Sequence, residues 1–407
     1  MPASPHHPIR WIVRAALCAT VLACAWIVAP ALSATPYLPP AVDFGQPLSG
    51  VERAPGATAR SGSGDARGVA GPVTHVSGVL EAPARFDVAG LEGELRNYEL
   101  RGRETGGEWT DWTETGSGDP VWFGGADELQ LRTRGWRPDG RIHYVNVSGD
   151  ATPTDSALTK LREGVSHVSV AAVEFVSGEP AMAELDRPPI VTREEWGAER
   201  RRGGCEPRKR PELGKVKAGV VHHTVSANDY SRAEAPRMVL AICRFHRDGN
   251  EWNDIGYNGL VDRFGNFYEG REGGLRKPII GAHAEGFNDQ TTGIASLGNH
   301  TDESISKAAM RTAADFIAWK LVQHGKDASG RTRLRSGGGS ANRYPAGKRV
   351  RVHKVIGHRR LGLTECPGDG LYADIERLRR KVERRIQAAG GVPGDGDGGG
   401  SSGGVGG

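Results

Sequence analysis

Glycine gathers in three segments of this chain, and this limits where a compact fold can form. The sequence holds 59 glycines in 407 residues, with enrichment in residues 35–71, 336–339 and 390–407. Stretches of this kind bury too little apolar surface to offset the conformational entropy lost on folding. The packed parts are therefore expected between them, and the length suffices for two domains of ordinary size.

The first 34 residues have the pattern of a secretory signal peptide. Arg10 and Arg14 precede an apolar run at residues 15–29, and small residues after Pro30 offer a cleavage site. A retained membrane anchor needs about 20 apolar residues, and this run is shorter. A lipoprotein signal ending at Cys24 is disfavoured, because apolar residues continue past it. We expect residues 1–34 to be removed and the mature protein to be secreted, with no membrane partner.

Composition excludes several other classes of protein. With 37% hydrophobic residues, 25% charged residues and a formal net charge of +4, the chain is too polar for a multi-span membrane protein. It is also neither a collagen nor a coiled coil. No lysine-rich block indicates nucleic-acid binding. We expect no nucleic-acid partner and a monomer.

The cysteine count indicates that the thiols do not all have the same role. Two of the five cysteines lie in the predicted signal peptide, which leaves Cys205, Cys243 and Cys366. Three thiols cannot all pair with one another. In an oxidising compartment two of them should form a disulfide, and the third needs another fate, such as metal ligation.

The first compact stretch is predicted to be rich in β-structure. Residues 35–72 are expected to form a disordered linker, and residues 73–180 carry short alternating runs separated by Gly, Asp and Pro, which is typical of a small β-sandwich. Four tryptophans fall here, and they could fill a small core or form a sugar-stacking surface; they are Trp109, Trp112, Trp122 and Trp136. No catalytic motif is found in this accessory domain.

The second stretch alternates strands and helices. A linker at residues 181–189 precedes it, and a disordered tail at 390–407 follows it. A capping box is expected at Ser231 and Glu234, where a helical period begins. The expected elements are strands at 215–224, 293–298 and 352–357, a hairpin at 257–271, and helices at 231–247, 305–324 and 371–389. This pattern predicts an α/β (α+β) domain over residues 190–389, with a central mixed sheet flanked by helices.

Three residues of this second stretch could hold a metal. A zinc site that catalyses hydrolysis has three protein ligands and one open position. His222 ends the first buried strand, His358 follows the strand at 355–357, and Cys366 comes eight residues later in a loop. The residues alone are a weak signal, because 13 histidines are scattered through the chain.

Five sequence strings strengthen that signal considerably. The strings "VVHHT", "EWNDIGYNGLVDRFGNFYEGR", "GAHAEGFN", "TTGIASLGNH" and "VIGHRRLGLTECPGD" occur in this order between residues 190 and 389. They resemble the motifs of peptidoglycan recognition proteins and of type 2 N-acetylmuramoyl-L-alanine amidases. The resemblance implies the mixed sheet flanked by helices and a Zn²⁺ cofactor bound by His222, His358 and Cys366. All three ligand types are present, unlike in family members that lost the cysteine and only bind.

The resemblance also implies roles for residues around the metal. Tyr257 and Thr364 would stabilise the oxyanion that forms when the amide carbonyl is attacked. The bacteriophage enzyme has lysine at the position of Thr364, whereas catalytic members of the animal type carry threonine. Four further motif residues are candidates for lining the substrate groove: His223, Arg271, His283 and Asn288. No glutamate is spaced as a general base, so the proton donor to the leaving amine is not assigned.

With the metal ligands assigned by the resemblance, Cys205 and Cys243 are left as the disulfide pair. His246, His300 and His353 match no motif and are expected to be ordinary structural residues. Residues 336–348 are expected to form a mobile loop. The residues after the string "YEGR" match neither common pattern of stem-peptide preference, so the diamino acid is not predicted.

The resulting hypothesis is a secreted, cell-wall-associated zinc amidase. It would cut the bond between N-acetylmuramic acid and L-alanine of its peptidoglycan substrate, with the N-terminal module targeting or positioning it. An N-terminal module before such a domain is loosely similar to the arrangement in actinobacterial exported recognition proteins. Two alternatives remain: a protein that binds muropeptides without cutting them, and a cysteine peptidase with Cys366 as nucleophile and His358 as base.

Overall fold

The structure is a computed structural model that describes residues 41–55, 72–92, 98–115, 118–134, 137–149 and 189–391. The predicted signal peptide and nearly all of the predicted tail lie outside these residues, as do Trp136 and residues 150–188. The described residues all fall within one compact unit, made of Leu38–Asp150 and Met182–Gly407. Among the described helices, none is long and apolar enough to cross a membrane.

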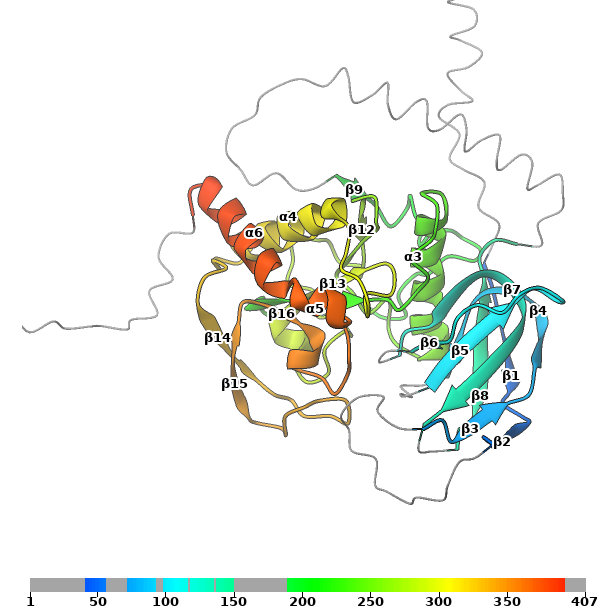
Figure 1. Ribbon diagram of the computed structural model, residues 1–407. Helices are drawn as coiled ribbons and strands as arrows, with labels where there is room; N and C mark the ends of the chain where they lie inside the picture. Colours follow the sequence, from blue (N-terminus) through cyan, green and yellow to red (C-terminus); the bar gives the residue numbers. More distant parts are fainter. Residues whose placement is uncertain are drawn as a thin grey trace, which may run out of the picture. The chain divides into compact units, whose positions relative to one another are not determined.

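The N-terminal domain is an antiparallel β-domain. Its strands are β1 (Val42–Pro47), β2 (Val51–Arg53), β3 (His75–Ser77), β4 (Leu80–Leu91), β5 (Tyr98–Arg103), β6 (Thr113–Glu114), β7 (Val121–Thr133) and β8 (Arg141–Asn146). They form one sheet in the order β1-β8-β4-β7-β3-β2, with β5 pairing β7 and β6 (Figure 1). Register shifts interrupt the pairing of the two longest strands, β4 and β7, at Phe86. Such irregularities bend strands, so a long sheet can enclose its own core.

Two of these strands, within residues 42–53, correct part of the prediction of a disordered linker at residues 35–72; residues 35–40 and 56–71 lie outside the described residues. β1 pairs with β8 from Val42 opposite Asn146 to Pro47 opposite Arg141, and β2 pairs with β3. The ring of Phe44 stacks on Tyr144 with 5.2 Å between ring centroids. The strand is stabilised by a partner about 100 residues away, which local composition cannot indicate. A proline at its last position is tolerated because β1 lies at the sheet edge.

The C-terminal domain contains a six-stranded mixed sheet, as predicted. Its strands are β9 (Ile190–Val191), β10 (Ala218–His223), β11 (Gly259–Val261), β12 (Phe267–Glu269), β13 (Thr291–Ser296) and β16 (Val355–Gly357), in the order β16-β10-β13-β11-β12-β9. A separate hairpin joins β14 (Arg331–Arg335) to β15 (Arg349–His353). The helices are α3 (Glu234–Arg244), α4 (Lys307–Gln323), α5 (Asp369–Ala373) and α6 (Ile375–Ala388), with a π-helical turn η1 (Phe245–Gly249) and 3₁₀ turns η2 (Asn288–Gln290) and η3 (His358–Arg360).

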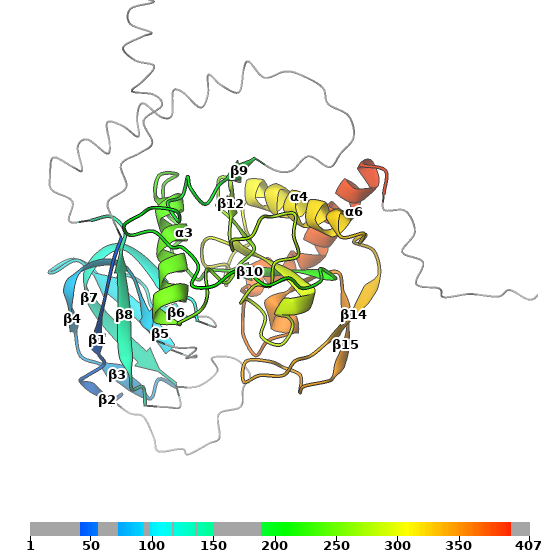
Figure 2. The ribbon, with the colours of Figure 1, turned by 180° about the vertical axis from the view of Figure 1, so that it is seen from behind.

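The side chains of the central strands alternate between two apolar clusters, so helices cover both faces of this sheet. Successive strand residues point to opposite faces. Leu260 and Ala295 pack in the apolar cluster of α3. Their neighbours Val261 and Ile294 pack in the cluster that holds α4 and α6. The sheet is therefore a middle layer, with α3 on one side and the adjacent helices α4 and α6 on the other (Figures 1 and 2).

The reciprocal bonds of the predicted capping box form between Ser231 and Glu234, although α3 begins at Glu234 and not at Ser231. The backbone N–H of Ser231 donates to Glu234 Oε2 at 2.7 Å, and the N–H of Glu234 donates to Ser231 Oγ at 3.3 Å. These reciprocal bonds satisfy donors that a helix start leaves open. Beyond α3 the helix widens into η1, which carries His246.

A disulfide joins Cys205 and Cys243, as the sequence resemblance implies. It ties the loop before β10 to α3, across a sequence separation of 38 residues. Next to it the buried Arg193 guanidinium lies 3.2 Å from Asp254 Oδ2 and donates to the carbonyl oxygen of Cys205 at 2.9 Å. The entrance of the domain is thus fixed both covalently and by a buried ion pair.

Removal of this disulfide is expected to destabilise the protein. In the chain-entropy description, opening a loop of this length costs about 4 kcal/mol. A Cys205→Ala/Cys243→Ala variant should therefore unfold at lower urea concentration than the wild type. A reducing agent should destabilise the wild type but leave the variant unchanged; equal sensitivity of the two proteins would contradict the assignment.

Candidate metal centre

Parallel strand pairing brings the two predicted histidine ligands together. β10 and β16 pair in parallel, and Val221 lies opposite Gly357. His222 and His358 each come one residue later, so both leave the same edge of the sheet. Their ring centroids lie 4.5 Å apart, and both residues are buried.

The third predicted ligand reaches this edge from a loop. The N–H of Cys366 donates to Thr364 Oγ1 at 3.1 Å, and its carbonyl accepts from the N–H of Arg359 at 2.8 Å. The loop thereby directs the Cys366 Sγ to 3.7 Å from His222 Nδ1. One ligand atom each from His222, His358 and Cys366 lie within 4.8 Å of one another.

The electrostatic setting of this trio suits a bound cation. Burial, together with the nearby His358, lowers the pKa of His222 far below that of a free imidazole. Burial likewise raises the pKa of the Cys366 thiol. A neutral imidazole offers a lone pair, and a thiolate in this apolar setting needs a cation to compensate its charge. Two imidazoles and one thiol are also a donor set that zinc prefers.

A fourth buried side chain orients the first histidine. His283 Nδ1 lies 3.1 Å from His222 Nε2. When Nδ1 of His222 faces the metal position, its Nε2 carries the hydrogen and donates to His283. Burial and the neighbouring His358 lower the pKa of His283 to about 3, so this acceptor stays neutral. Partners of this kind fix the orientation of a metal-binding imidazole.

The trio opens into a cleft. The cleft is lined by Asp119, His222, Trp252, Tyr257, Ala282, His283, Ala284, Glu285, Asn288, Ala341, His358 and Cys366. The ring of Tyr257 lies 5.2 Å from that of His222. The centre therefore combines three potential ligands, a phenol and an open side.

Comparisons with known proteins identify the family. Residues 212–369 match the N-acetylmuramoyl-L-alanine amidase family. Peptidoglycan-recognition protein SC2 of Drosophila simulans is 30% identical over 186 residues, which are 46% of this chain and 84% of that protein. This chain belongs to the peptidoglycan-recognition and amidase family. The N-acetylmuramoyl-L-alanine amidase of Sus scrofa is 32% identical over 215 residues, 52% of this chain but only 31% of that longer protein.

Two solved structures are similar to part of the chain. Human PGRP-IBETAC in complex with glycosamyl muramyl pentapeptide is 26% identical, with a TM-score of 0.36, and the match covers 46% of this chain and 95% of that one. Drosophila PGRP-LB is 25% identical, with a TM-score of 0.35 and coverage of 46% and 93%.

The other family motif residues divide between the cleft and its surroundings. His283 and Asn288 line the cleft, where Asn288 Oδ1 accepts from the N–H groups of His283 and Ala284 at 2.9 and 2.7 Å. His223 turns away, and its Nδ1 accepts from the N–H of His300 at 3.1 Å. Neither Thr364 nor Arg271 is among the residues that line the cleft.

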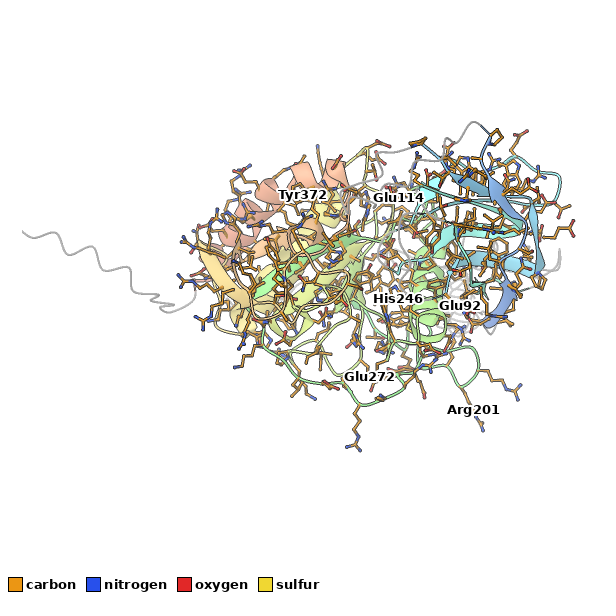
Figure 3. The ribbon with its side chains drawn as sticks, turned by 90° about the horizontal axis from the view of Figure 1, so that it is seen from below. Glu92, Glu114, Arg201, His246, Glu272 and Tyr372 are labelled. Carbon is orange, nitrogen blue, oxygen red and sulfur yellow. A yellow bond between two sulfur atoms is a disulfide. The ribbon has the colours of Figure 1, made fainter. Side chains whose placement is uncertain are left out.

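Two residues of the cleft, Asp119 and Ala341, lie outside the family motifs. Asp119 comes from the N-terminal domain, and His246, expected to be ordinary, lies 3.2 Å from it. His246, which η1 carries, is labelled in Figure 3. Ala341 comes from the segment expected to be mobile, but its N–H donates to Glu285 Oε2 and Asn342 Nδ2 donates to the Glu285 carbonyl. These contacts pin the segment against the cleft.

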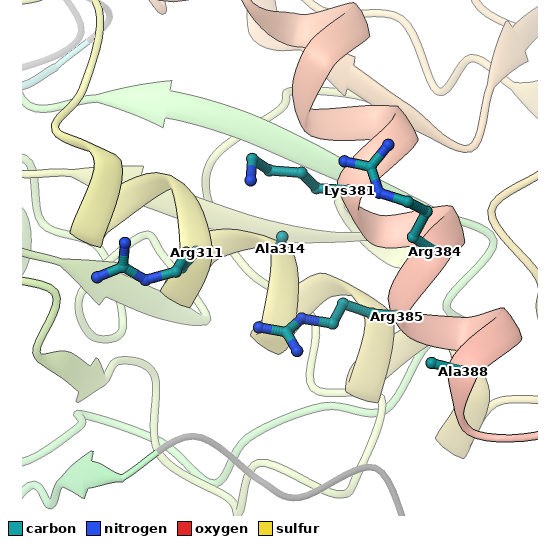
Figure 4. Close-up of a pocket in the computed structure, with 6 residues that line it drawn as sticks. All are labelled: Arg311, Ala314, Lys381, Arg384, Arg385 and Ala388. Atoms are coloured by element: carbon teal, nitrogen blue, oxygen red, sulfur yellow. The ribbon is translucent and has the colours of Figure 1, made fainter.

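A second hollow lies between α4 and α6, and its chemistry differs. Its charged lining consists of Arg311, Lys381, Arg384 and Arg385 (Figure 4). No nucleophile or metal-ligating side chain lines it. The family motifs and this basic groove occupy different parts of the domain, so the groove is not the candidate centre.

A glycine in β13 makes room for His283. A Cβ added at Gly293 would lie 2.5 Å from His283 Cγ, closer than real side chains approach. Gly293→Ala should therefore displace the imidazole and destabilise the protein by about 1–3 kcal/mol, measured by urea unfolding. The control is Gly78→Ala, where an added Cβ meets no atom within 4 Å. Equal unfolding midpoints for both variants would show that His283 is not tightly enclosed.

Proposed function

We propose that this protein is a secreted, zinc-dependent N-acetylmuramoyl-L-alanine amidase acting on peptidoglycan in the cell wall. One observation carries the proposal: His222, His358 and Cys366 converge at one edge of the sheet and face a cleft. The proposal extends the family's amidase activity to this chain. A monomer, released from its signal peptide, is the form expected to act.

The chain's residues divide into metal ligands and supporting groups. His222, His358 and Cys366 would hold the ion, and His283 would orient His222. Zn²⁺, when bound, would polarise the amide carbonyl as a Lewis acid and lower the pKa of the attacking water to about 7, so that hydroxide is available at neutral pH. The remaining surface of the cleft would exclude bulk water and position the muropeptide.

Proposed substrate contacts follow from the hydrogen-bonding groups near the cleft. Asn288 and Glu285 line it with an amide and a carboxylate. Thr364 and Tyr257 stay the proposed catalytic side chains, and His223 and Arg271 stay proposed binding residues through the family motifs. The Thr364 hydroxyl oxygen already accepts from the N–H of Cys366, which leaves its hydrogen available as a donor. This hydrogen could meet negative charge developing on the substrate carbonyl.

A second candidate function is muropeptide binding without hydrolysis. It is favoured by relatives whose names describe recognition rather than cleavage, such as peptidoglycan-recognition protein SC2. Binding needs the cleft but not a complete ligand set. The intact trio in this chain therefore favours hydrolysis.

A cysteine peptidase mechanism is less well supported than the zinc amidase mechanism on physical grounds. A nucleophilic cysteine needs a lowered thiol pKa, whereas burial raises the pKa of Cys366. The near neighbour of Cys366 Sγ is His222 Nδ1 at 3.7 Å, and the same geometry serves a shared metal. Thiol alkylation with zinc bound should therefore leave activity intact.

The decisive experiment is digestion of purified peptidoglycan by the wild type and by Cys366→Ser. The wild type should release free stem peptides, detected by mass spectrometry, and should contain stoichiometric zinc by elemental analysis. Cys366→Ser should lose both, because a serine hydroxyl is a poor zinc ligand compared with a thiolate.

Controls separate the three functions. Circular dichroism should show that Cys366→Ser remains folded, and calorimetry with a soluble muropeptide should measure binding by each protein. Intact stem peptides from the zinc-loaded wild type, together with tight muropeptide binding, would overturn hydrolysis in favour of recognition. Full activity after zinc removal, abolished by alkylation, would instead establish the peptidase mechanism.

A further inference from the structure

The N-terminal β-domain shares an apolar core with the helix that leads to the cleft. Val88, Trp122 and Val145 of the β-domain belong to the same buried cluster as Met238 and Ile242 of α3. Both sets of residues lie within one compact unit. Burial of such side chains is the main favourable contribution to a stable contact. The two domains therefore form a packed interface.

Close approaches at glycines show how tight this interface is. A Cβ at Gly90 of β4 would lie 2.5 Å from the Phe245 ring in η1. A Cβ at Gly249 would lie 3.2 Å from the His143 ring of β8. The absence of side chains at both positions lets backbone and ring pack directly against each other.

Polar contacts fix one β-domain loop over the cleft. The Asn250 side-chain amide donates to the carbonyl of Gly118 at 2.7 Å. Gly118 has a φ of +83°, which favours glycine. An ion pair between Arg244 and Asp43 lies at another part of the same interface. The residue after Gly118 is Asp119, so these contacts determine where its carboxylate lies.

The Asp119 carboxylate receives hydrogen bonds from two side chains of the C-terminal domain. The Tyr257 hydroxyl donates to it, with 2.7 and 2.8 Å to the two carboxylate oxygens. His246 Nε2 lies 3.2 Å from Oδ1. Because the N–H of Gly256 donates to His246 Nδ1 at 3.2 Å, the ring hydrogen must be on Nε2, which donates to Asp119. Asp119 is only 5% exposed and lines the cleft.

We propose that Asp119 is a positioning residue of the amidase centre, contributed by the accessory domain, which fixes Tyr257 and His246 so that both domains build the cleft. The inference rests on the proposed function, because the positioned phenol belongs to the amidase centre. No family motif includes Asp119, since the matched residues begin at position 212.

This contact defines what Tyr257 offers to a substrate. A phenol has one hydrogen and two lone pairs, and the hydrogen is directed to Asp119. Burial and the Asp119 charge raise the pKa of Tyr257 well above 10, so the phenol keeps this hydrogen. The oxygen therefore faces the cleft as an acceptor, suited to an N–H of the stem peptide and not to the oxyanion that the family motif implies for Tyr257. Asp119 sets the direction of that acceptor.

The kinetic test is a double-mutant cycle in the full-length, zinc-loaded protein. Asp119→Ala should lower kcat about ten- to a hundredfold, because loss of the carboxylate lets the phenol rotate out of position. Asp119→Asn, which keeps one acceptor oxygen, should recover part of this loss. In a Tyr257→Phe background, Asp119→Ala should cost little more, because both changes disable one unit.

The matched control is Asp127→Asn, in the same β-domain. Asp127 pairs with Arg85 at 3.6 Å, but it does not line the cleft. This variant should keep wild-type kcat and KM. Equal losses for Asp127→Asn and Asp119→Ala, or fully additive losses with Tyr257→Phe, would mean that Asp119 only stabilises the fold and would overturn the proposal. A rise in kcat for Asp119→Ala would overturn it as well, because the contact would then restrain the centre.

A spectroscopic test is independent of catalysis. In metal-free protein labelled with ¹³Cζ-tyrosine, Tyr257→Phe identifies the Tyr257 signal. Asp119→Ala should shift this signal, because the phenol loses a charged acceptor, while Asp127→Asn should not. An unchanged Tyr257 signal overturns the inference. If the Tyr257 signal shifts in Asp119→Ala as expected but the wild type releases no stem peptides, the proposed function is overturned and the Asp119–Tyr257 contact is established.

Discussion

The parallel pairing of β10 with β16 is the constraint on which the candidate centre depends. Because Val221 lies opposite Gly357, the next residue on each chain is a histidine at the same sheet edge. A shift of one residue would send one imidazole to the opposite face. Both strands are enclosed by apolar side chains on both faces, which leaves little freedom for such a slip. The core thus fixes the distance between the two candidate ligands.

The same burial that fixes the ligands also limits their protonation. Burial lowers the pKa of His222 and raises that of Cys366, so both side chains prefer to be neutral when no cation compensates them. Such a group of side chains contributes no charge of its own and gains most from a cation. His283 extends this effect, because its imidazole accepts from His222 without carrying a charge. The arrangement is better suited to holding a divalent ion than to activating a free thiol.

The sequence was informative wherever the signal was local or repeated in known relatives. The capping box at Ser231 needs only a spacing of three residues, and the three ligands stand in recognisable motifs. Strand β1 was missed because its stability comes from pairing with β8, as in the bond between Gln46 and Tyr144 across 98 residues. Asp119 was missed for the same reason, because its partner Tyr257 lies 138 residues away. Long-range contacts of this kind leave no periodicity in the sequence.

The shared core changes the role that the N-terminal domain can have. A module that only targets an enzyme to the cell wall could be joined by a linker and need not touch the centre. Here Gly90 admits the ring of Phe245, and the loop at Gly118 is held by Asn250. Separating the domains would expose apolar surface and leave Tyr257 and His246 without their common acceptor. The cost of that separation makes the β-domain a structural part of the cleft, so the activity of the C-terminal domain alone should differ from that of the whole chain.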